Sequence, residues 1–410
     1  MSKIHTGDVV ESALDEFNSR TNSLVGKMEA LRSDIELIKQ SARELSSLLG
    51  SDSESNASEQ GVKSYLKSYV KKLLVDNEED IWTAPVDAQH FTPHPFISIE
   101  ERAAQGCRTK FITLFNLKGG VGKTTIASNL TAAFAEANYK LKGNIRGKAL
   151  RVLAVDLDFQ ASMTERCMRQ NFLTKFYSDK PTLPLRQLFW STPEQTPLVE
   201  YIYPFVECEK AKIIPTDRRL DQCDSAAFCS QFFDLREMRF EFRKWFHRND
   251  FLEKYDLVIF DCPPRKTVAA LCALTASDFV FIPCTFDLIE LHPVLFTVKW
   301  LLEIIYKLKL KLQIGGIILN RANAETKLSS AERNLLETIC KNIETNALKS
   351  GSEYAEDYRE RFPNSSPMPL DSFIPKRTGI FGEYPGAIPG AKADYFERIA
   401  SEIYQKFLSK

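Results

Sequence analysis

The stretch FITLFNLKGGVGKTT, residues 111–125, joins a continuous apolar run to a glycine-rich segment that ends in a lysine and two threonines. A strand, a glycine-rich loop and a helix in this order form a phosphate loop, whose backbone N–H groups wrap phosphate oxygens. The usual pattern, G-x-x-x-x-G-K-[ST], would require glycine at position 117, where this chain has Leu117. Instead, an additional lysine, Lys118, precedes the glycines. The stretch therefore predicts a phosphate loop of an unusual kind.

A phosphate loop assigns chemistry to individual side chains. Lys123 is expected to reach the β- and γ-phosphates of a nucleotide, and the Thr124 hydroxyl is expected to ligate Mg²⁺. The N-terminus of the following helix adds partial positive charge at the same place. The residues of this loop that we expect to bind the nucleotide are Lys118, Gly119, Gly120, Val121, Gly122, Lys123, Thr124 and Thr125.

Short apolar runs alternate with helical stretches from the phosphate loop to the end of the chain. Each run is continuous in hydrophobicity, which indicates strands covered on both faces in a parallel sheet between two helix layers. We expect a doubly wound α/β domain over residues 108–410, with its ligand beyond the carboxyl ends of the strands. The runs lie at residues 111–117, 149–156, 211–215, 256–261, 279–283, 314–320 and 372–374.

Composition limits the class of protein. The 410 residues exceed what one hydrophobic core usually supports, which favours a large domain with an appendage. Lys and Arg balance Asp and Glu at 54 each, which argues against binding nucleic acid by bulk charge. The nine cysteines form no C-x-x-C pair, and no signal peptide or membrane-length apolar run is evident. These features favour a soluble cytoplasmic protein with reduced thiols.

The N-terminal part of the chain has a different pattern. Residues 10–49 place apolar side chains at alternating steps of four and three, which predicts a coiled-coil helix over 1–50. A single amphipathic helix packed on its own domain is the alternative. Residues 51–107 are expected to form a linker and short helical connector, with a basic amphipathic helix over 62–75 and an irregular segment over 81–107.

Three motifs together resemble one known family. KGGVGKTT resembles the deviant Walker A motif of the ParA/MinD family of ATPases, which belongs to the SIMIBI class. VDLDFQAS, residues 155–162, is similar to the family's second motif, although Phe159 stands in place of the usual proline and Ser162 in place of the usual asparagine. DLVIFDCPP, residues 256–264, resembles its Walker B and switch segment.

The resemblance implies an ATPase that acts as a dimer. In the family, the lysine at the place of Lys118 crosses to the phosphates of the opposite protomer, so ATP is sandwiched in a homodimer. The residues implied in catalysis are Lys118, Lys123 and Asp158, the last of which positions or activates the attacking water. Asp261 is implied to hold Mg²⁺ through water together with Thr124, and Asp156 to support the ion and its water shell. ATP and Mg²⁺ are the implied cofactors.

Contacts to the adenine base are implied at two strand ends. Asn320 ends the run at 314–320 and Arg321 follows it, and Pro375 and Lys376 follow the last run. These positions look like the family's base-binding positions. An ordinary loop or capping role for Asn320 is the alternative.

The family's known roles imply two alternatives for this chain. The first is plasmid or chromosome partition on nucleoid DNA, where a partner protein triggers hydrolysis. The second is an ATP switch whose coiled coil recruits or regulates an effector complex, in positioning or phage defence. Membrane attachment is disfavoured, because the C-terminal stretch 393–410 has the pattern of a packed helix. The cations that suggest a DNA-facing surface are Arg218, Arg219, Arg265, Lys266, Lys376 and Arg377.

Residues 232–248 interleave arginines with aromatic residues. Apolar side chains recur there at helical spacing, which favours a core-facing helix over a platform on which bases stack.

Overall fold

The computed structural model describes most of the predicted ATPase domain. The described residues are 86, 93–168, 170–178, 185–189, 192–194, 198–206, 208–216, 219–220, 223–224, 237–285, 288–322, 358, 360, 369–375 and 393–409. The predicted coiled coil over 1–50 and the basic helix over 62–75 lie outside these residues.

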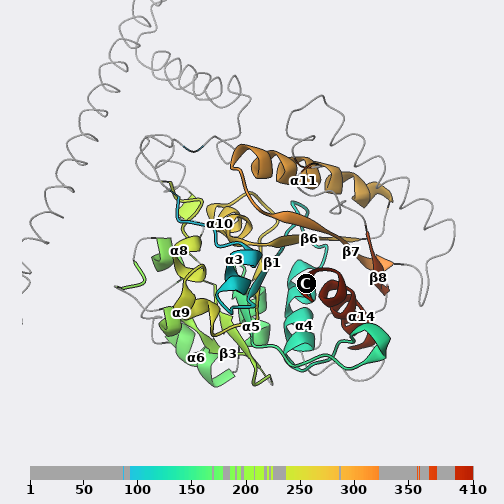
Figure 1. The fold of residues 1–410 in the computed structure, drawn as a ribbon, viewed down its shortest axis with the longest axis horizontal. Coiled ribbons are helices and arrows are strands. Elements are labelled where there is room, and N and C mark those ends of the chain that lie inside the picture. Colours follow the sequence, from blue (N-terminus) through green and yellow to red (C-terminus); the bar gives the residue numbers. More distant parts are fainter. Residues whose placement is uncertain are drawn as a thin grey trace, which may run out of the picture. The chain divides into compact units, whose positions relative to one another are not determined.

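One sheet of eight strands organises the described part of the chain (Figure 1). Its spatial order is β3-β4-β2-β5-β1-β6-β7-β8, and every neighbouring pair is parallel except β3 with β4. The predicted mostly parallel sheet is confirmed, and each predicted run overlaps a strand. The strands are β1 (Lys110–Leu114), β2 (Val152–Asp156), β3 (Tyr203–Pro204), β4 (Ala211–Ile214), β5 (Leu257–Asp261), β6 (Phe279–Thr285), β7 (Gln313–Ala322) and β8 (Pro369–Pro375).

Helices cover both faces of this sheet. On β5, Leu257 and Ile259 pack into one apolar cluster, whereas Val258 and Phe260 pack into another on the opposite face. The first cluster includes residues of α4 (Lys123–Ala135), α5 (Ser162–Cys167), α6 (Gln170–Ser178) and α14 (Ala393–Ile403). The second includes residues of α8 (Arg243–Phe246), α9 (Asn249–Leu252), α10 (Val268–Ala276) and α11 (Leu288–Lys307). The doubly wound architecture is therefore confirmed.

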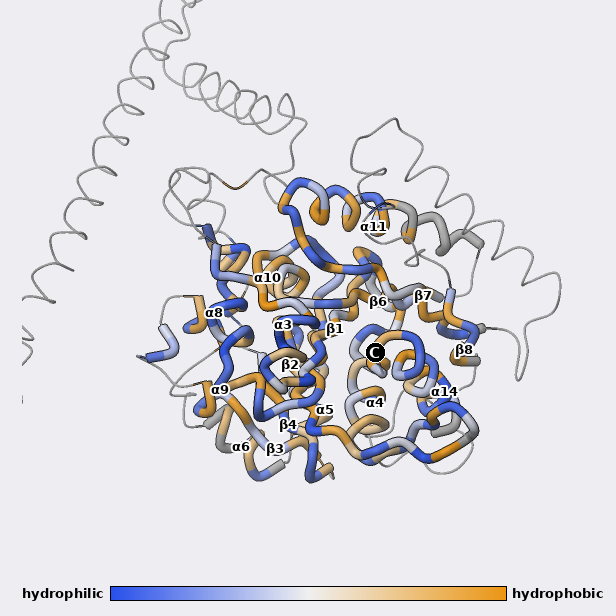
Figure 2. The backbone as a smooth tube through the Cα atoms, viewed as in Figure 1, coloured by the Kyte–Doolittle hydropathy of each residue, from blue (hydrophilic) through white to orange (hydrophobic). Residues whose placement is uncertain are grey.

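The helices that are buried in the domain consist mainly of apolar residues on their buried sides. Every residue of α10 is buried, and Figure 2 colours this helix mainly as hydrophobic. The predicted packing of the C-terminal helix is also confirmed, because Phe396, Ile399 and Ile403 of α14 are buried. Among the described residues, no helix combines the length and the apolar character needed to cross a membrane. The short helices that remain are α3 (Ile99–Ala104), the 3-10 turns at Lys142–Asn144, Leu185–Phe189 and Leu198–Tyr201, and a π-helical turn at Tyr404–Leu408.

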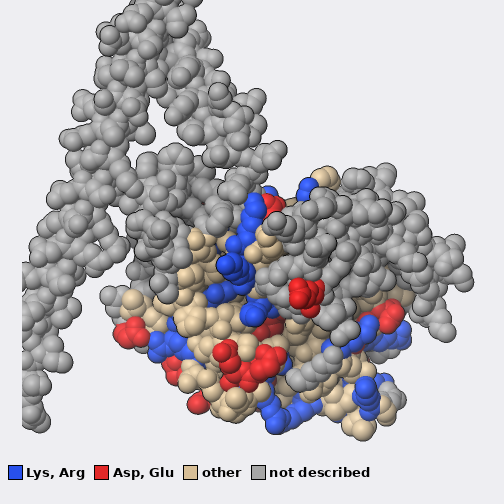
Figure 3. Space-filling model, turned by 45° about the horizontal axis from the view of Figure 1, so that its top comes forward, with Lys and Arg blue, Asp and Glu red and all other residues tan. Residues whose placement is uncertain are grey.

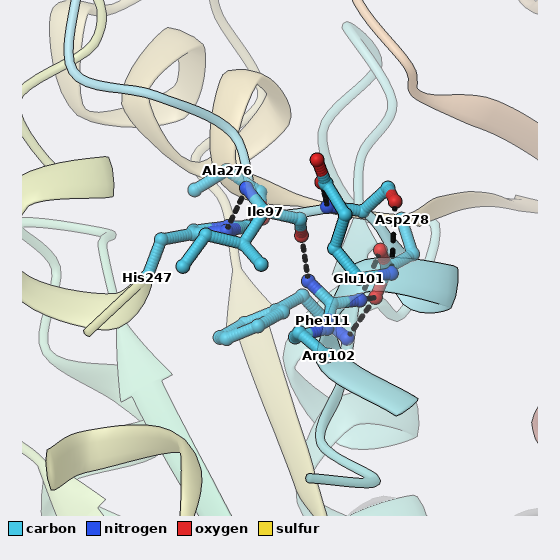
Figure 4. A network of polar contacts seen from close by, with 8 residues as sticks. Ile97, Glu101, Arg102, Phe111, His247, Ala276 and Asp278 are labelled. Atoms are coloured by element: carbon cyan, nitrogen blue, oxygen red, sulfur yellow. Dashed lines mark hydrogen bonds and ion pairs between the residues drawn. The ribbon is translucent and has the colours of Figure 1, made fainter. Parts of the chain in front are cut away.

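The segment predicted to be irregular contains helix α3, which the sequence reading missed. A capping box begins it: the Ser98 hydroxyl accepts from the Glu101 N–H (3.2 Å), and the Glu101 carboxylate accepts from the Ser98 N–H (2.6 Å). Arg102 of this helix donates to both carboxylate oxygens of Asp278, at 2.5 and 2.6 Å, with both side chains buried (Figure 4). The ion pair fastens α3 to the sheet, because Asp278 also accepts from the Phe111 N–H of β1 (2.8 Å).

A buried histidine makes a second attachment of the same segment. His247 Nδ1 accepts from the Ile97 N–H (3.1 Å), and its Nε2 lies 2.8 Å from the Ala276 carbonyl oxygen (Figure 4). Nδ1 as acceptor leaves Nε2 as the donor of the neutral ring. Burial lowers the pKa of His247 to about 3, so the ring stays neutral at physiological pH. Segment 93–107 is thus packed onto the domain through polar contacts as well as apolar ones.

The predicted helix over 232–248 is wrong for most of its described part. Residues 237 and 238 have no regular structure, residues 239–242 form turns, and only Arg243–Phe246 are helical. Arg239 forms a buried ion pair with Glu237 (2.5 Å), two residues away, and side chains two apart do not face each other on a helix. The core-facing part of the prediction holds, because Phe242 and Phe246 are buried.

Candidate nucleotide-binding site

A cavity of about 300 Å³ lies beyond the carboxyl ends of β1, β2 and β5. Parallel strands of a doubly wound sheet direct their C-terminal loops to one edge, where ligands bind. The glycine-rich loop after β1 forms one wall, and the loops after β2 and β5 form others. The residues that line the cavity are Gly119, Gly120, Gly122, Lys123, Thr124, Thr125, Asp158, Ser162, Arg166, Pro264 and Arg321.

The backbone of the glycine-rich loop needs glycine at two positions. Gly120 and Gly122 have φ angles of 76° and 89°, in the left-handed region where a Cβ atom is strained. Gly122 is the N-cap of α4, so the first N–H groups of that helix lie at the cavity. The loop therefore has the form that the sequence predicted for binding phosphate.

Lys123 lies at the floor of the loop. Its buried ammonium donates to the carbonyl oxygens of Asn116 (3.1 Å) and Lys118 (2.8 Å). Burial lowers its pKa, and the negative charge of Asp261 partly opposes this. The side chain is thus held beside the cavity at the junction of strand and helix.

Asn116 connects the phosphate loop to the rest of the domain, a role that the sequence reading missed. Its Nδ2 donates to the Pro283 carbonyl oxygen of β6 (2.8 Å). Its Oδ1 accepts from the Lys118 N–H (3.0 Å) and from the Thr297 hydroxyl of α11 (3.0 Å). The front of the loop is therefore fixed by contacts to a neighbouring strand and to a helix of the other layer.

Asp261 ends β5 below the cavity, with no exposed surface. Neither carboxylate oxygen meets the geometry of a hydrogen bond with any described residue. Burial raises its pKa well above the usual value, and the charge of Asp156 adds to this, whereas Thr124 and Lys123 act in the opposite direction. A buried carboxylate beside a hydroxyl offers the hard oxygen ligands that Mg²⁺ prefers.

The donor set also fits a magnesium ion held mainly by water and phosphate. Among the described residues, no group of three or more His, Cys, Asp and Glu side chains is arranged to hold a metal. Mg²⁺ in nucleotide sites keeps several waters and takes only one or two protein ligands. Thr124 and Asp261 therefore provide as many protein ligands as such a magnesium site needs.

Asp156 has a different environment, although it lies opposite Asp261 across β2 and β5. Its Oδ2 accepts from the N–H (2.8 Å) and hydroxyl (2.7 Å) of Thr164, and its Oδ1 from the Asp158 N–H (3.1 Å). Burial raises its pKa to about 6, against the effect of these hydrogen bonds. Asp156 thus fixes the loop that carries Asp158, and its support of a metal ion stays a prediction.

The remaining predicted site residues differ in how buried they are and in whether they line the cavity. Asp158 is half-buried and lines the cavity. Arg321 also lines it, with a φ angle of 56°. Asn320 is fully buried, and its Nδ2 donates to the Val121 carbonyl oxygen of the phosphate loop (2.9 Å). Pro375 ends β8, which pairs with β7. The base-binding roles of Asn320, Arg321 and Pro375 stay predictions.

Two residues of α5 line the cavity without having been predicted. Ser162 and Arg166 are four residues apart, so they share one face of the helix. That spacing was the available signal in the sequence. Arg166 adds an exposed guanidinium to the wall opposite the phosphate loop.

A phosphate loop after the central strand of a mostly parallel, doubly wound sheet defines the chain as a P-loop nucleotide-binding protein. A family model described as an AAA domain matches residues 109–314, half of the chain. The chain belongs to the ParA/MinD-like family of P-loop ATPases.

Two relatives and one solved structure illustrate what the chain is similar to. The sporulation initiation inhibitor protein Soj of Bacillus subtilis is 30% identical over 223 residues, which cover 53% of this chain and 75% of Soj. An uncharacterized protein of Methanocaldococcus jannaschii is 28% identical over 235 residues, covering 57% of this chain and 81% of its own. Among solved structures, an ATP complex of McdA from Cyanothece aligns at 17% identity over 66% of this chain and 85% of its own, with a TM-score of 0.45.

Proposed function

We propose that this chain binds ATP with Mg²⁺ and hydrolyses it to ADP and phosphate. The buried carboxylate of Asp261, which has no hydrogen-bond partner among the described residues, is the observation that carries the proposal. It lies below a cavity lined by Lys123 and Thr124 of the phosphate loop. A buried carboxylate of this kind is costly for the fold, and a bound cation compensates the cost.

The residues have distinct roles in binding. The N–H groups of the glycine-rich loop and the ammonium of Lys123 bind the phosphates, and Asn320, Arg321 and Pro375 contribute to the base site. Thr124 and Asp261 would hold Mg²⁺, and Asp156 would support them. The ion would supply positive charge that offsets the charge of the bound phosphates.

Hydrolysis requires a positioned water and stabilised charge. Asp158 lines the cavity and orients a water for attack on the γ-phosphorus. The new bond joins the water oxygen to phosphorus as the bond to the bridging oxygen of ADP breaks, and the proton of the water passes by way of the Asp158 carboxylate to solvent. Lys123 in the same subunit stabilises the negative charge that develops on the phosphate oxygens.

A second copy of the chain completes the site. Lys118 is half-buried and precedes the exposed residues Gly119 and Gly120, and it is not among the residues that line the cavity of its own subunit. A lysine at this place reaches the phosphates of a facing subunit once two chains pair on ATP. ATP binding then drives pairing, and hydrolysis ends it.

The biological role proposed is partition of a plasmid or chromosome on nucleoid DNA, with a partner protein that stimulates hydrolysis. Several relatives carry names that refer to chromosome partitioning, including ParA of Myxococcus xanthus. In the view of Figure 3, one cluster of Lys and Arg side chains lies in the upper middle of the described surface, above a cluster of Asp and Glu. Of the cations suggested for DNA, Arg219 and Arg265 are exposed, whereas Arg218, Lys376 and Arg377 lie outside the described residues.

Two substitutions test the enzymatic proposal. Lys123→Ala is expected to abolish ATP binding, and Asp158→Ala is expected to retain binding and lose turnover by about 10²–10⁴-fold. Phosphate release and equilibrium nucleotide binding are the measurements. Glu165→Ala is the matched control, because this exposed carboxylate of α5 does not line the cavity. An Asp158→Ala chain that hydrolyses ATP at the wild-type rate would contradict the catalytic assignment.

A further inference from the structure

Two loops leave adjacent strands side by side at the cavity. The loop over 157–161 follows β2, and the loop over 262–267 follows β5. The strands are parallel and in register up to their last residues, so the two loops begin at the same level. The Leu157 N–H donates to the Asp261 carbonyl oxygen (2.9 Å), which joins the loops at their base.

The first loop is a tight turn around the proposed catalytic carboxylate. Asp158 Oδ1 accepts from the Gln160 N–H (3.1 Å), and the Asp158 carbonyl oxygen accepts from the Ala161 N–H (2.9 Å). Phe159 follows Asp158 directly and is half-buried. A contact that fixes the side chain of Phe159 therefore also restricts the position of the adjacent residue, Asp158.

The second loop is fixed on both sides of Arg265. Pro263 and Pro264 restrict the backbone before it. After it, Thr267 caps α10, its hydroxyl accepting from the Ala270 N–H (3.0 Å). Pro264 also lies beside Gly119 of the phosphate loop: a Cβ built on that glycine would be 3.8 Å from the proline ring. Arg265 thus extends from a rigid base that touches the phosphate loop.

The two loops meet again at their tips. The guanidinium carbon of Arg265 lies 4.4 Å from the centre of the Phe159 ring, within the range of a cation–π contact. The next residue, Lys266, makes the same kind of contact in another direction, with its ammonium 5.3 Å from the ring of Trp300 in α11. One loop therefore carries two cations, whose cation–π contacts are made with different rings: Arg265 with Phe159 and Lys266 with Trp300.

We propose that the contact between Phe159 and Arg265 is a latch that holds Asp158 over the γ-phosphate. Arg265 is a positioning residue in this arrangement, because it acts through Phe159 and not on the substrate. The inference rests on the proposed ATPase function. It accounts for a large aromatic side chain next to the catalytic carboxylate, where the guanidinium of Arg265 on the neighbouring loop lies over its ring. A guanidinium occupied in this way also contributes less to a DNA-binding surface than an unstacked one.

A double-mutant cycle on the full chain tests the latch. The variants are Phe159→Leu, Arg265→Gln and the double substitution, each assayed for ATP turnover and for equilibrium ATP binding. We expect each single change to lower kcat by about two- to fivefold, the factor that a partly exposed cation–π contact supplies. The KM for ATP is expected to stay within about twofold, because the phosphate loop is untouched. The double variant is expected to lose no more than either single one.

Two further variants separate positioning from simple packing. Phe159→Tyr keeps the aromatic face and is expected to retain wild-type kcat. Lys266→Gln removes the neighbouring cation and is the matched control, so combining it with Phe159→Leu should show no coupling beyond experimental error.

The outcomes distinguish the two levels of the proposal. If the wild-type chain hydrolyses ATP but the losses of kcat in Phe159→Leu and Arg265→Gln multiply in the double variant, the latch alone is overturned. Losses confined to KM, or a Phe159→Tyr variant as impaired as Phe159→Leu, also overturn it. A wild-type chain that shows no Mg²⁺-dependent turnover overturns the proposed function and the latch together.

Discussion

Asp261 ends β5 without exposed surface, and its carboxylate lies beside that of Asp156 at the ends of two paired strands. Two buried carboxylates so close cannot both be charged without cost. Asp156 is compensated by Thr164 and by the Asp158 N–H, whereas Asp261 has no hydrogen-bond partner among the described residues. The fold therefore bears a cost at Asp261 that a ligand can relieve.

Asp261→Asn is expected to stabilise the ligand-free chain while it weakens the metal site. Removing the charge should raise the free energy of unfolding by about 1–3 kcal/mol at pH 8, the usual cost of a buried group without partners. The affinity for Mg²⁺ in the presence of ATP should fall by about 10–100-fold. Urea unfolding and metal titration are the measurements. A variant less stable than the wild type would show that Asp261 supports the fold directly.

The pH dependence of this gain follows from the direction of the pKa shifts. The pKa values of Asp261 and Asp156 are raised in the folded state, that of Asp156 to about 6. A raised pKa contributes stability below the unfolded value near 4, and this contribution is lost as pH rises through the folded value. The advantage of Asp261→Asn should therefore shrink between pH 8 and pH 5.

At the scale of elements, helix α11 is followed by a lysine, Lys309, in the left-handed conformation that favours glycine. The Leu310 N–H donates to the Ile305 carbonyl oxygen (2.9 Å) and the Lys309 N–H to that of Tyr306 (3.1 Å), the two bonds of a Schellman motif. Lys309 occupies the position that favours glycine, with a φ angle of 50°.

Lys309→Gly is expected to stabilise the protein. The substitution removes left-handed strain from an exposed residue and should raise the free energy of unfolding by about 0.5–1 kcal/mol. Lys311→Gly is the matched control, since this residue is also exposed but lacks a positive φ angle. It should lower stability by about as much. Equal effects of the two substitutions in thermal unfolding would contradict the argument.

The attachment of α3 gives a second prediction at this scale. Arg102→Met leaves the Asp278 carboxylate buried without its cation and is expected to cost about 3–5 kcal/mol of unfolding free energy. Arg248→Met removes exposed ion pairs with Glu194 and Asp250 and should have a much smaller effect, because solvent screens both pairs. Urea unfolding of the full chain compares the two. A small effect at Arg102 would mean that apolar contacts alone hold segment 93–107.

The elements differ in how well the sequence predicted them. Strands such as β6 were found because a buried parallel strand needs apolar residues on both faces. Helix α3 was missed although Ser98 and Glu101 carry the spacing of a capping box, because nearby prolines suggested an irregular segment. The helix over 232–248 was predicted from periodicity, which does not reveal an ion pair between Arg239 and Glu237.

The candidate site shows the same division. The glycines and Lys123 were identifiable because their roles depend on local sequence. The contact between Asn116 and Thr297 joins residues 181 positions apart, and no local pattern announces it. Arg166 enters the cavity only because α5 packs beside α4.

At the scale of the whole molecule, charge limits how DNA can be bound. The formal net charge is zero, so bulk attraction to phosphates is weak and binding must depend on a local basic face. If two chains pair on ATP, the faces of both contact one duplex. The number of phosphates neutralised then doubles, and so does the slope of log affinity against log salt concentration.

The full chain is therefore expected to bind nonspecific double-stranded DNA more tightly with ATP than with ADP, and with about twice the salt slope. Retention on DNA between 50 and 200 mM salt, alongside the mass from light scattering, measures both quantities. Lys118→Met should bind ATP yet keep the ADP-like slope and the smaller mass, because it lacks the cation lent to the facing subunit. Equal slopes in the two nucleotides, with a mass that ATP does not change, would exclude pairing as the source of DNA affinity. If ATP doubled the mass but the chain were not retained on DNA, the ATP-dependent dimer would be supported, and its basic face would be assigned to a protein partner in place of DNA.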